Sequence, residues 1–505
     1  MNELLLGIDC GSTVTKAALF DLEGRELASR SSGTKTVTRS NGGVERSSAG
    51  IWASVVEAVR TLTSESGLDA GSVAAIGCSG HGNGLYALDA RGQALPTAYQ
   101  SLDSRADEIV EEWDRQGFGE ALFEDGWQQL WPGQPFALLE WLRRNEPEVH
   151  DAISTVLLCK DFVNYRLTGR AVSDYSDMSA TGLLSNAGLV YNERLLGLLG
   201  LDGLAAKLPP LVSSTEVIGT LSASAADELG LRAETPVVGG LFDVAATAVG
   251  SGGAAEGSLS LIAGTWSINA VVTAQPLIDR TLLMTTAFAD AERWIAIEAS
   301  ATSAANLSWF AAEAFVDEGV ADAEGSVFDR CCGVAASAEL RLSSPIYHPF
   351  LYGSPTDPRA RAGFYGIAGS HTRADLARAV LEGVAFGHRR HVDNLMGVGA
   401  TATRVRLTGG GARSAFWSQM FADVLGMRIE VPDAEETGAR GAALAAGVGI
   451  GVYRDIDEAM DNATGVASGY QPNPDLSSVY ARRFEIYRRL VEAMEPVWRA
   501  LASAQ

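Results

Sequence analysis

The sequence has little cysteine, little positive charge and no long apolar run. Its five cysteines in 505 residues are odd in number, and two are adjacent, which favours reduced thiols over a disulfide framework. Lys and Arg total 39 against 62 Asp and Glu, and the net charge of −23 argues against nucleic acid or an anionic membrane as a partner. No stretch of about 18 strongly apolar residues occurs, and the N-terminus lacks a secretory signal pattern. We therefore expect a cytoplasmic protein with no membrane span.

Familiar nucleotide and metal motifs are also missing. There is no Walker A sequence, and no glycine cluster fits the dinucleotide fingerprint. Glu382, His388 and His391 form a compact group of metal-binding residue types, but Arg389 and Arg390 lie between the histidines and no Cys pair accompanies them. We predict no metal centre in this group.

Hydrophobic residues make up 47% of the chain, enough for two or more domains with large cores. Residues 4–9 and 14–20 are predicted strands that a tight turn joins into a hairpin, and a third strand follows the turn at 21–24. Apolar residues recur at helical spacing through 51–62, and 73–78 is the next predicted strand. The Ala- and Gly-rich run 438–451 predicts a closely packed helix.

A short internal sequence repeat relates the two halves of the chain. The segment GIDCGST at 7–13 resembles SLIAGTW at 260–266, so that Gly11 aligns with Gly264 and Ser12 with Thr265. Each segment is an apolar strand, a Gly-hydroxyl turn and a second apolar strand. A duplicated two-domain architecture follows as a hypothesis, with chance similarity of small residues as the alternative. The glycine-rich stretch 249–257 could supply a hinge.

The two turns are candidate phosphate loops. Backbone N–H groups and hydroxyls at Gly11, Ser12 and Thr13, and again at Gly264 and Thr265, can surround phosphate oxygens without a cationic patch. An ordinary hairpin is the alternative for the first turn alone.

Three more segments could take part in binding a nucleotide. Asp9, at the end of the first strand, could hold Mg²⁺ directly or through water, and Lys16 could neutralise phosphate charge. Gly410, Gly411 and Ser414 lie in a glycine cluster between a predicted strand at 405–407 and a predicted helix at 415–425. Glycines at such a junction let a nucleotide approach the backbone, and close packing is the alternative.

Asp243 is the best candidate base. It ends the apolar strand of PVVGGLFD, just before a helix-forming segment, where a carboxylate is rigidly positioned to accept a proton from a substrate hydroxyl. Capping of that helix by Asp243 is the alternative.

Polar residues on another loop could bind the hydroxyls of a small molecule. His81 and Asn83 follow a predicted strand on a glycine-rich, flexible loop. Asp103 and Arg105 could line the same binding site. A surface turn or an ion pair would explain Asp103 and Arg105 equally well.

Taken together, these segments resemble the FGGY carbohydrate kinases, which belong with actin, hexokinase and the heat-shock ATPases to the ribonuclease H-like group of duplicated ATPase domains. The resemblance covers nearly the whole chain. Residues 7–13 are similar to the family's first phosphate loop, 263–267 to its second, and 408–414 to its adenosine segment. The family's mid-domain lysine-aspartate element corresponds to Lys160 and Asp161, and the stretch that follows it to 173–181.

The resemblance implies an α/β fold of two actin/hexokinase-like domains with an interdomain cleft that holds ATP and Mg²⁺. It implies that Asp243 is the general base, that Asp9 and Asp243 serve the magnesium ion, and that a homodimer forms. We expect an N-terminal domain at 1–247, a C-terminal nucleotide-binding domain at 248–455 and a helical extension at 456–505.

The expected substrate is a ketopentose or related keto-sugar. The loop departs from the D-xylulose kinase pattern, because His81-Gly82-Asn83 replaces a glutamine-methionine-histidine run and Ser101 replaces a tryptophan. The segments 131–133, 239–244 and 348–353 are most similar to the L-xylulose kinase branch. L-Xylulose is therefore the first choice, with D-xylulose, ribulose or a polyol as alternatives.

Two other classes remain open at this point. A nucleotide-switch module would bind ATP and a protein partner without phosphorylating a metabolite. A polysaccharide-binding module could use some of the ten tryptophans, although most of these recur within helix-like apolar stripes that favour core packing.

Overall fold

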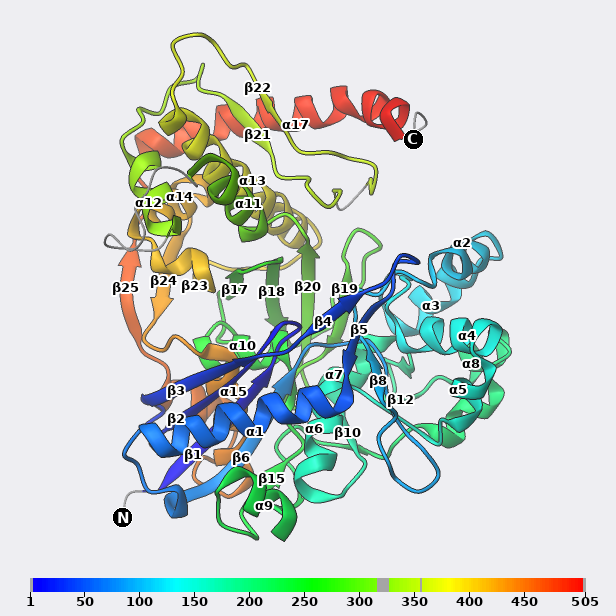
Figure 1. Ribbon diagram of the computed structural model, residues 1–505. Helices are drawn as coiled ribbons and strands as arrows, with labels where there is room; N and C mark the ends of the chain where they lie inside the picture. Colours follow the sequence, from blue (N-terminus) through cyan, green and yellow to red (C-terminus); the bar gives the residue numbers. More distant parts are fainter. Residues whose placement is uncertain (1–2, 316–326, 355–356, 503–505) are drawn as a thin grey trace. The chain divides into compact units, whose positions relative to one another are not determined.

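The structure is a computed structural model, and it describes residues 3–315, 327–354 and 357–502 (Figure 1). The chain divides into two compact units. Unit 1 comprises Met1–Ala255, Val272–Ala296 and Ala434–Gly465; unit 2 comprises Glu256–Val271, Ile297–Asp433 and Val466–Gln505. Among the described residues, no helix has both the length and the apolar character that a membrane span requires.

The central sheet of unit 1 begins with the predicted hairpin. β1 (Leu4–Cys10) pairs antiparallel with β2 (Val14–Phe20), and β2 with β3 (Glu26–Gly33). On its other side β1 runs parallel to β6 (Val73–Gly80), and β6 runs parallel to β15 (Pro236–Val238) and β16 (Leu241–Phe242). The carboxyl ends of β1, β6 and β16 therefore lie at one edge. In spatial order the strands are β14 (Val217–Thr220), β15 (Pro236–Val238), β6 (Val73–Gly80), β1 (Leu4–Cys10), β2 (Val14–Phe20) and β3 (Glu26–Gly33), with β16 (Leu241–Phe242) paired to β6.

Helices cover this sheet, and the predicted helix at 51–62 is α1 (Ser48–Glu65). It begins at Ser48 because the Ser47 hydroxyl accepts a hydrogen bond from the N–H of Gly50. The other helices of unit 1 are α2 (Asp107–Arg115), α3 (Phe118–Gly126), α4 (Pro135–Asn145), α5 (Pro147–Ala152), α6 (Cys159–Thr168), α7 (Tyr175–Met178), α8 (Glu193–Leu198), α9 (Ala223–Leu229), α10 (Asp243–Ser251), α15 (Thr437–Gly449) and α16 (Ile456–Ala463).

Helix α15 packs against β1, β6 and α10 through glycines, as its small residues predict. A Cβ atom on Gly7 would lie 1.9 Å from the carbonyl oxygen of Ala439. A Cβ atom on Gly441 would lie 1.9 Å from that of Ala246. The backbone of α15 is in direct contact with the backbones of β1 and α10 at these points, so no side chain fits between these elements.

A second seven-stranded sheet repeats the arrangement. β17 (Ser258–Ala263) and β18 (Ser267–Thr273) form an antiparallel hairpin, β17 runs parallel to β23 (Arg404–Thr408), and β23 runs parallel to β24 (Arg428–Pro432). This is the order of β2, β1 and β6, so the structure confirms the duplicated α/β architecture. The strands are β19 (Met284–Ala287), β20 (Trp294–Ser300), β18 (Ser267–Thr273), β17 (Ser258–Ala263), β23 (Arg404–Thr408), β24 (Arg428–Pro432) and β25 (Val466–Tyr470).

The described residues form five further α-helices and five small sheets. The helices are α11 (Ala304–Phe315), α12 (Val327–Ala336), α13 (Arg373–Gly397), α14 (Ala415–Leu425) and α17 (Pro474–Ala502). The small sheets are β4 (Thr36–Thr38), β5 (Val44–Ser47) and β8 (Thr97–Tyr99); β7 (Tyr86–Leu88) and β9 (Thr155–Leu157); β10 (Ser173–Asp174) and β13 (Leu211–Val212); β11 (Leu184–Ser185) and β12 (Val190–Tyr191); and, in unit 2, β21 (Ile346–His348) and β22 (Gly363–Tyr365).

The units differ in two ways from the domains that the sequence predicts. Helix α15 belongs to unit 1 because its glycines and alanines pack on β1 and β6. The region after 455 is not wholly helical, since β25 pairs antiparallel with β24, with Tyr470 opposite Ile429. The boundaries 1–247, 248–455 and 456–505 stay a prediction.

Candidate active site

Three strand ends bring the predicted catalytic segments of unit 1 together. Asp9 lies opposite Ser79 in the parallel pair of β1 and β6, and Phe242 lies opposite Gly80 in the pair of β16 and β6. The first phosphate turn, the loop 81–84 and Asp243 therefore leave the sheet side by side. This is the edge where α/β sheets place polar binding groups.

Asp243 is the first residue of α10, and Phe242 occupies the capping position without a side-chain cap bond. The carboxyl is only partly exposed. Burial and then the negative charge of Asp9 raise the pKa of Asp243 well above its usual value, and the backbone N–H of Val244 opposes this effect. The capping alternative does not describe Asp243, and its raised pKa suits proton transfer.

Asp9 accepts a hydrogen bond of 2.8 Å from the Ser79 hydroxyl, and its Oδ2 atom lies 2.7 Å from where a Cβ atom on Gly438 would be. Burial raises the pKa of Asp9, while Ser79 and Lys16 act to lower it. Two electrostatically coupled carboxyl groups suit Mg²⁺, which takes one or two carboxylates and keeps several waters. In the described part of the chain, no three His, Cys, Asp or Glu residues form a ready-made metal cluster.

The predicted phosphate turn after β1 is closed by a backbone hydrogen bond. The N–H of Gly11 donates to the carbonyl of Val14 at 3.1 Å. Lys16 forms an ion pair with Glu436 at 2.7 Å, yet 40% of the Lys16 side chain remains exposed. The ammonium group is therefore near the turn and reachable from solvent.

Arg46 supports the same turn, and sequence reasoning missed it. Its Nη1 donates to the carbonyl of Gly11 at 3.0 Å, and its Nη2 donates to the Tyr86 hydroxyl, also at 3.0 Å. The Tyr86 hydroxyl in turn lies 2.9 Å from Nε2 of His81. A buried arginine within the polar segment 44–47 has no sequence signal that separates it from a surface arginine.

The loop after β6 lies against Phe242, the residue that precedes Asp243. A Cβ atom on Gly82 would come within 2.5 Å of the Phe242 ring. The His81 ring is buried and engaged with Tyr86, and Asn83 donates to the carbonyl of Ala180 at 3.0 Å. The buried Oδ1 atom of Asn83 has no hydrogen-bond partner, so this acceptor is unused within the protein; its contact with a substrate stays a prediction.

Asp103 lies in a buried ion pair. Its carboxylate contacts Nε of Arg105 at 2.8 Å and accepts from the N–H of Val44 at 2.8 Å. Arg105 also pairs with Glu45 at 2.7 Å. These bonds correspond to the ion-pair alternative, and direct contact of Asp103 with substrate stays a prediction.

Unit 2 places its own predicted segments together. Ile262 lies opposite Thr408 in the parallel pair of β17 and β23, so the turn at Gly264 and Thr265 lies beside the glycine cluster 409–411. A Cβ atom on Gly411 would be 2.7 Å from the Cβ atom of Ala263. The Ser414 hydroxyl caps α14 by accepting from the N–H of Trp417 at 3.3 Å.

The three members of the group at 382–391 each have a different hydrogen-bond or ion-pair partner. The pairs are Glu382 with Arg483 at 2.7 Å, His388 with Asn269 at 2.9 Å, and His391 with Glu298 at 2.7 Å.

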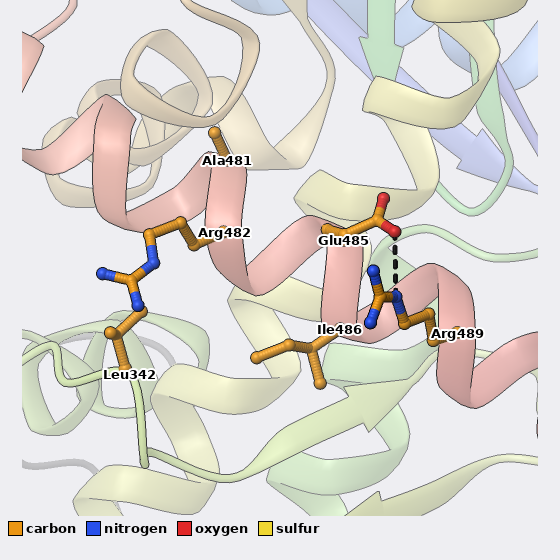
Figure 2. Close-up of a pocket in the computed structure, with 6 residues that line it drawn as sticks. All are labelled: Leu342, Ala481, Arg482, Glu485, Ile486 and Arg489. Atoms are coloured by element: carbon orange, nitrogen blue, oxygen red, sulfur yellow. Dashed lines mark hydrogen bonds and ion pairs between the residues drawn. The ribbon is translucent and has the colours of Figure 1, made fainter.

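A cavity of about 600 Å³ lies along α17 in unit 2 (Figure 2), and none of its lining residues belongs to these segments. Arg489 donates to Glu485 at 3.0 Å within its wall, and Leu342 and Ile486 are 38% and 41% exposed. Nothing in the structure indicates what covers it.

Comparison with protein families identifies two domains that together cover most of the chain. Residues 4–250 match the N-terminal domain of the FGGY family of carbohydrate kinases, and residues 259–450 match its C-terminal domain. These matches set aside the switch-module and polysaccharide-binding alternatives.

Individual relatives agree with the family matches. The chain is 36% identical over 98% of both chains to an L-xylulose/3-keto-L-gulonate kinase of Escherichia coli, and 35% identical over 97% of this chain and 99% of a probable L-xylulose kinase of Pasteurella multocida. The structure superimposes on the ligand-bound xylulose kinase from Lactobacillus acidophilus with a TM-score of 0.89, at 25% identity over 99% and 100% of the two chains. The chain belongs to the FGGY family of carbohydrate kinases and is an ATP-dependent sugar kinase.

Proposed function

We propose that this kinase transfers the terminal phosphoryl group of ATP to a terminal hydroxyl of a ketopentose, with L-xylulose as the first choice. The observation that carries the proposal is the position of Asp243, which follows β16 directly beside the phosphate turn after β1 and the loop after β6. Phosphoryl transfer depends on alignment and charge stabilisation more than on covalent help from the protein.

Asp243 accepts the proton of the sugar hydroxyl as that oxygen attacks the phosphorus atom. Its ionised form is the active one, and its partial burial keeps the carboxylate free of strong hydration. Asn83 and His81 orient the sugar from the neighbouring loop. Asp103 holds the neighbouring loop of the sugar site in place through its bonds to Val44 and Arg105.

The nucleotide contacts divide between the two units. Gly11, Ser12, Thr13 and Lys16 in unit 1 bind phosphate oxygens, as do Gly264 and Thr265 in unit 2, while Gly410, Gly411 and Ser414 border the adenosine. Asp9 and Asp243 would hold Mg²⁺, which would supply charge neutralisation at the phosphates.

Charge favours a neutral sugar over a sugar acid. A carboxylate on the substrate needs an available cation, but Arg105 is paired with Asp103 and Glu45. Lys160, which packs against Gly80 and Gly240, is paired with Asp161 at 2.5 Å and Asp174 at 2.9 Å. These pairs support L-xylulose ahead of 3-keto-L-gulonate.

The test is ADP formation from ATP and Mg²⁺ across a panel of L-xylulose, D-xylulose, the two ribuloses, 3-keto-L-gulonate and polyols. We expect the highest kcat/KM with L-xylulose. A higher value with D-xylulose, a ribulose or a polyol would replace L-xylulose as the substrate, and a higher value with the sugar acid would contradict the charge argument.

The pH dependence follows from the raised pKa of Asp243. Because only the ionised carboxylate accepts a proton, kcat/KM for the sugar should fall as the pH falls through the pKa of Asp243. That fall should begin well above the pKa of about 3.9 of an ordinary aspartate. Direct measurement of ADP between about pH 4.5 and 9 tests this, and a profile flat down to about pH 5 would contradict it.

The remaining expectations concern the surroundings of the enzyme. We propose that it works as a homodimer in a reducing cytoplasm, without nucleic-acid or membrane partners. The five cysteines are buried free thiols, which suits such a compartment.

A further inference from the structure

The buried lysine-aspartate element of unit 1 has no part in the mechanism above. Nζ of Lys160 contacts carboxylates of Asp161, Asp174 and Asp177 at 2.5, 2.9 and 3.6 Å, and all four side chains are fully buried. Burying a cation with three carboxyl groups is costly, and an apolar core would be cheaper. The geometry of the neighbouring main chain suggests what this cluster does.

The main chain that leads into Asp243 is held from α6. Asn164 donates from Nδ2 to the carbonyl of Gly239 at 2.8 Å. Gly240 has φ +78°, and a Cβ atom there would lie 3.0 Å from Cδ of Lys160. The aliphatic part of Lys160 therefore packs against Gly240, three residues before Asp243.

The third and closest support is Ser176. The backbone N–H of Phe242, which precedes Asp243, donates to the Ser176 hydroxyl at 3.0 Å. That hydroxyl donates its own hydrogen to Oδ2 of Asp174 at 2.6 Å. Since a hydroxyl has one hydrogen and an ionised carboxylate can only accept, the bond to Asp174 leaves the Ser176 oxygen lone pairs for Phe242.

Asp174 is itself fixed. Its Oδ2 also accepts from the N–H of Ser176 at 2.9 Å and the hydroxyl of Ser214 at 2.7 Å, and its Oδ1 contacts Lys160. The chain of contacts runs from Lys160 through Asp174 and Ser176 to the N–H of Phe242. Each bond to the carboxylate is charge-assisted and geometrically restrictive.

We propose that Ser176, oriented by Asp174 and Lys160, is a positioning residue that aims the carboxylate of Asp243 at the sugar hydroxyl. The proposal deepens the proposed function and rests on Asp243 as the base. It assigns the lysine-aspartate element to alignment of the reacting groups, where a displacement of about 1 Å can cost about a hundredfold in rate.

The test compares two serines on the same carboxylate oxygen. Ser176→Ala removes the acceptor of the Phe242 N–H. Ser214→Ala removes a hydroxyl of similar burial that donates to Asp174, and it leaves in place the Ser214 carbonyl that accepts from the N–H of Gly240. We expect kcat of Ser176→Ala to fall by about ten- to a hundredfold. The KM values for sugar and ATP should stay within about twofold, because binding groups are untouched.

The control separates alignment from general damage to the buried cluster. Ser214→Ala should keep kcat within about twofold of the wild type. Equal losses of kcat in the two alanine variants, or a raised KM with unchanged kcat in Ser176→Ala, would overturn the proposal. If Ser176→Ala does not fold, Ser176→Cys decides by the same criteria, because a thiol preserves the volume but is a weak donor and acceptor.

Asp243→Asn in the same series distinguishes failure of the two proposals. A fully active Asp243→Asn would contradict the assignment of Asp243 as the general base, and the positioning role of Ser176 would be overturned with it. An inactive Asp243→Asn with a fully active Ser176→Ala would leave the base in place and overturn only the positioning role.

Discussion

Replacing Asp243 with asparagine is expected to lower kcat by about 10²–10⁴-fold while nucleotide binding is largely kept. The amide has nearly the shape of the carboxylate but cannot accept the sugar proton. Asp243 is also the first residue of α10, so asparagine leaves the helix start intact. The comparison is made with saturating L-xylulose and ATP, and ADP affinity is measured by calorimetry.

A matched control is available at another helix start. Asp107 is the first residue of α2 in the same unit, and it is exposed. Asp107→Asn changes the same charge at the same helical position and should retain kcat within about twofold. A modest effect of Asp243→Asn, comparable with that of Asp107→Asn, would contradict the base assignment.

Patterns local in the sequence predicted the fold well. The hairpin of β1 and β2, the helix α1 and the strand β6 all follow from apolar periodicity and turn residues. The helix after the glycine cluster was predicted at 415–425, and α14 has those bounds. The sequence repeat at 7–13 and 260–266 correctly indicated the duplicated sheets, because each copy repeats one strand-turn-strand unit.

Features that depend on contacts between distant residues could not be predicted. Lys16 pairs with Glu436, which lies more than four hundred residues later, and no spacing rule connects the two. Arg46 is buried because Gly11 and Tyr86 accept its hydrogen bonds, and both partners come from other strands or turns. The same holds for Ser176 and Phe242, whose bond exists only once the sheet is assembled.

The candidate site lies between these two cases. Strand ends place Asp9 and Asp243 at one edge, as a parallel sheet requires, and the family resemblance predicts a role for each. The positions of their neighbours came only from tertiary contacts. The short strand β25 was missed because its alternation is weak and its partner β24 is distant in sequence.

The second large expected effect is on folding. Gly441→Ala in α15 should destabilise unit 1 by about 3 kcal/mol, the upper end of the usual range for overpacking. The new methyl group would lie 1.9 Å from the carbonyl oxygen of Ala246 in α10. That oxygen is part of a buried helix backbone, so no side-chain rotation can relieve the contact. Urea unfolding followed by circular dichroism should give a lower midpoint than the wild type.

Gly50→Ala in α1 is the matched control, because it adds the same methyl group to a helix of the same unit. The nearest atom to that Cβ lies at 3.4 Å, which is ordinary contact. Since alanine favours helix over glycine by roughly 1 kcal/mol, Gly50→Ala should be neutral or slightly stabilising. If Gly441→Ala unfolds at the same urea concentration as Gly50→Ala, then α10 and α15 are free to move apart. The close backbone contact would then not be what holds α15 against the sheet that carries Asp9.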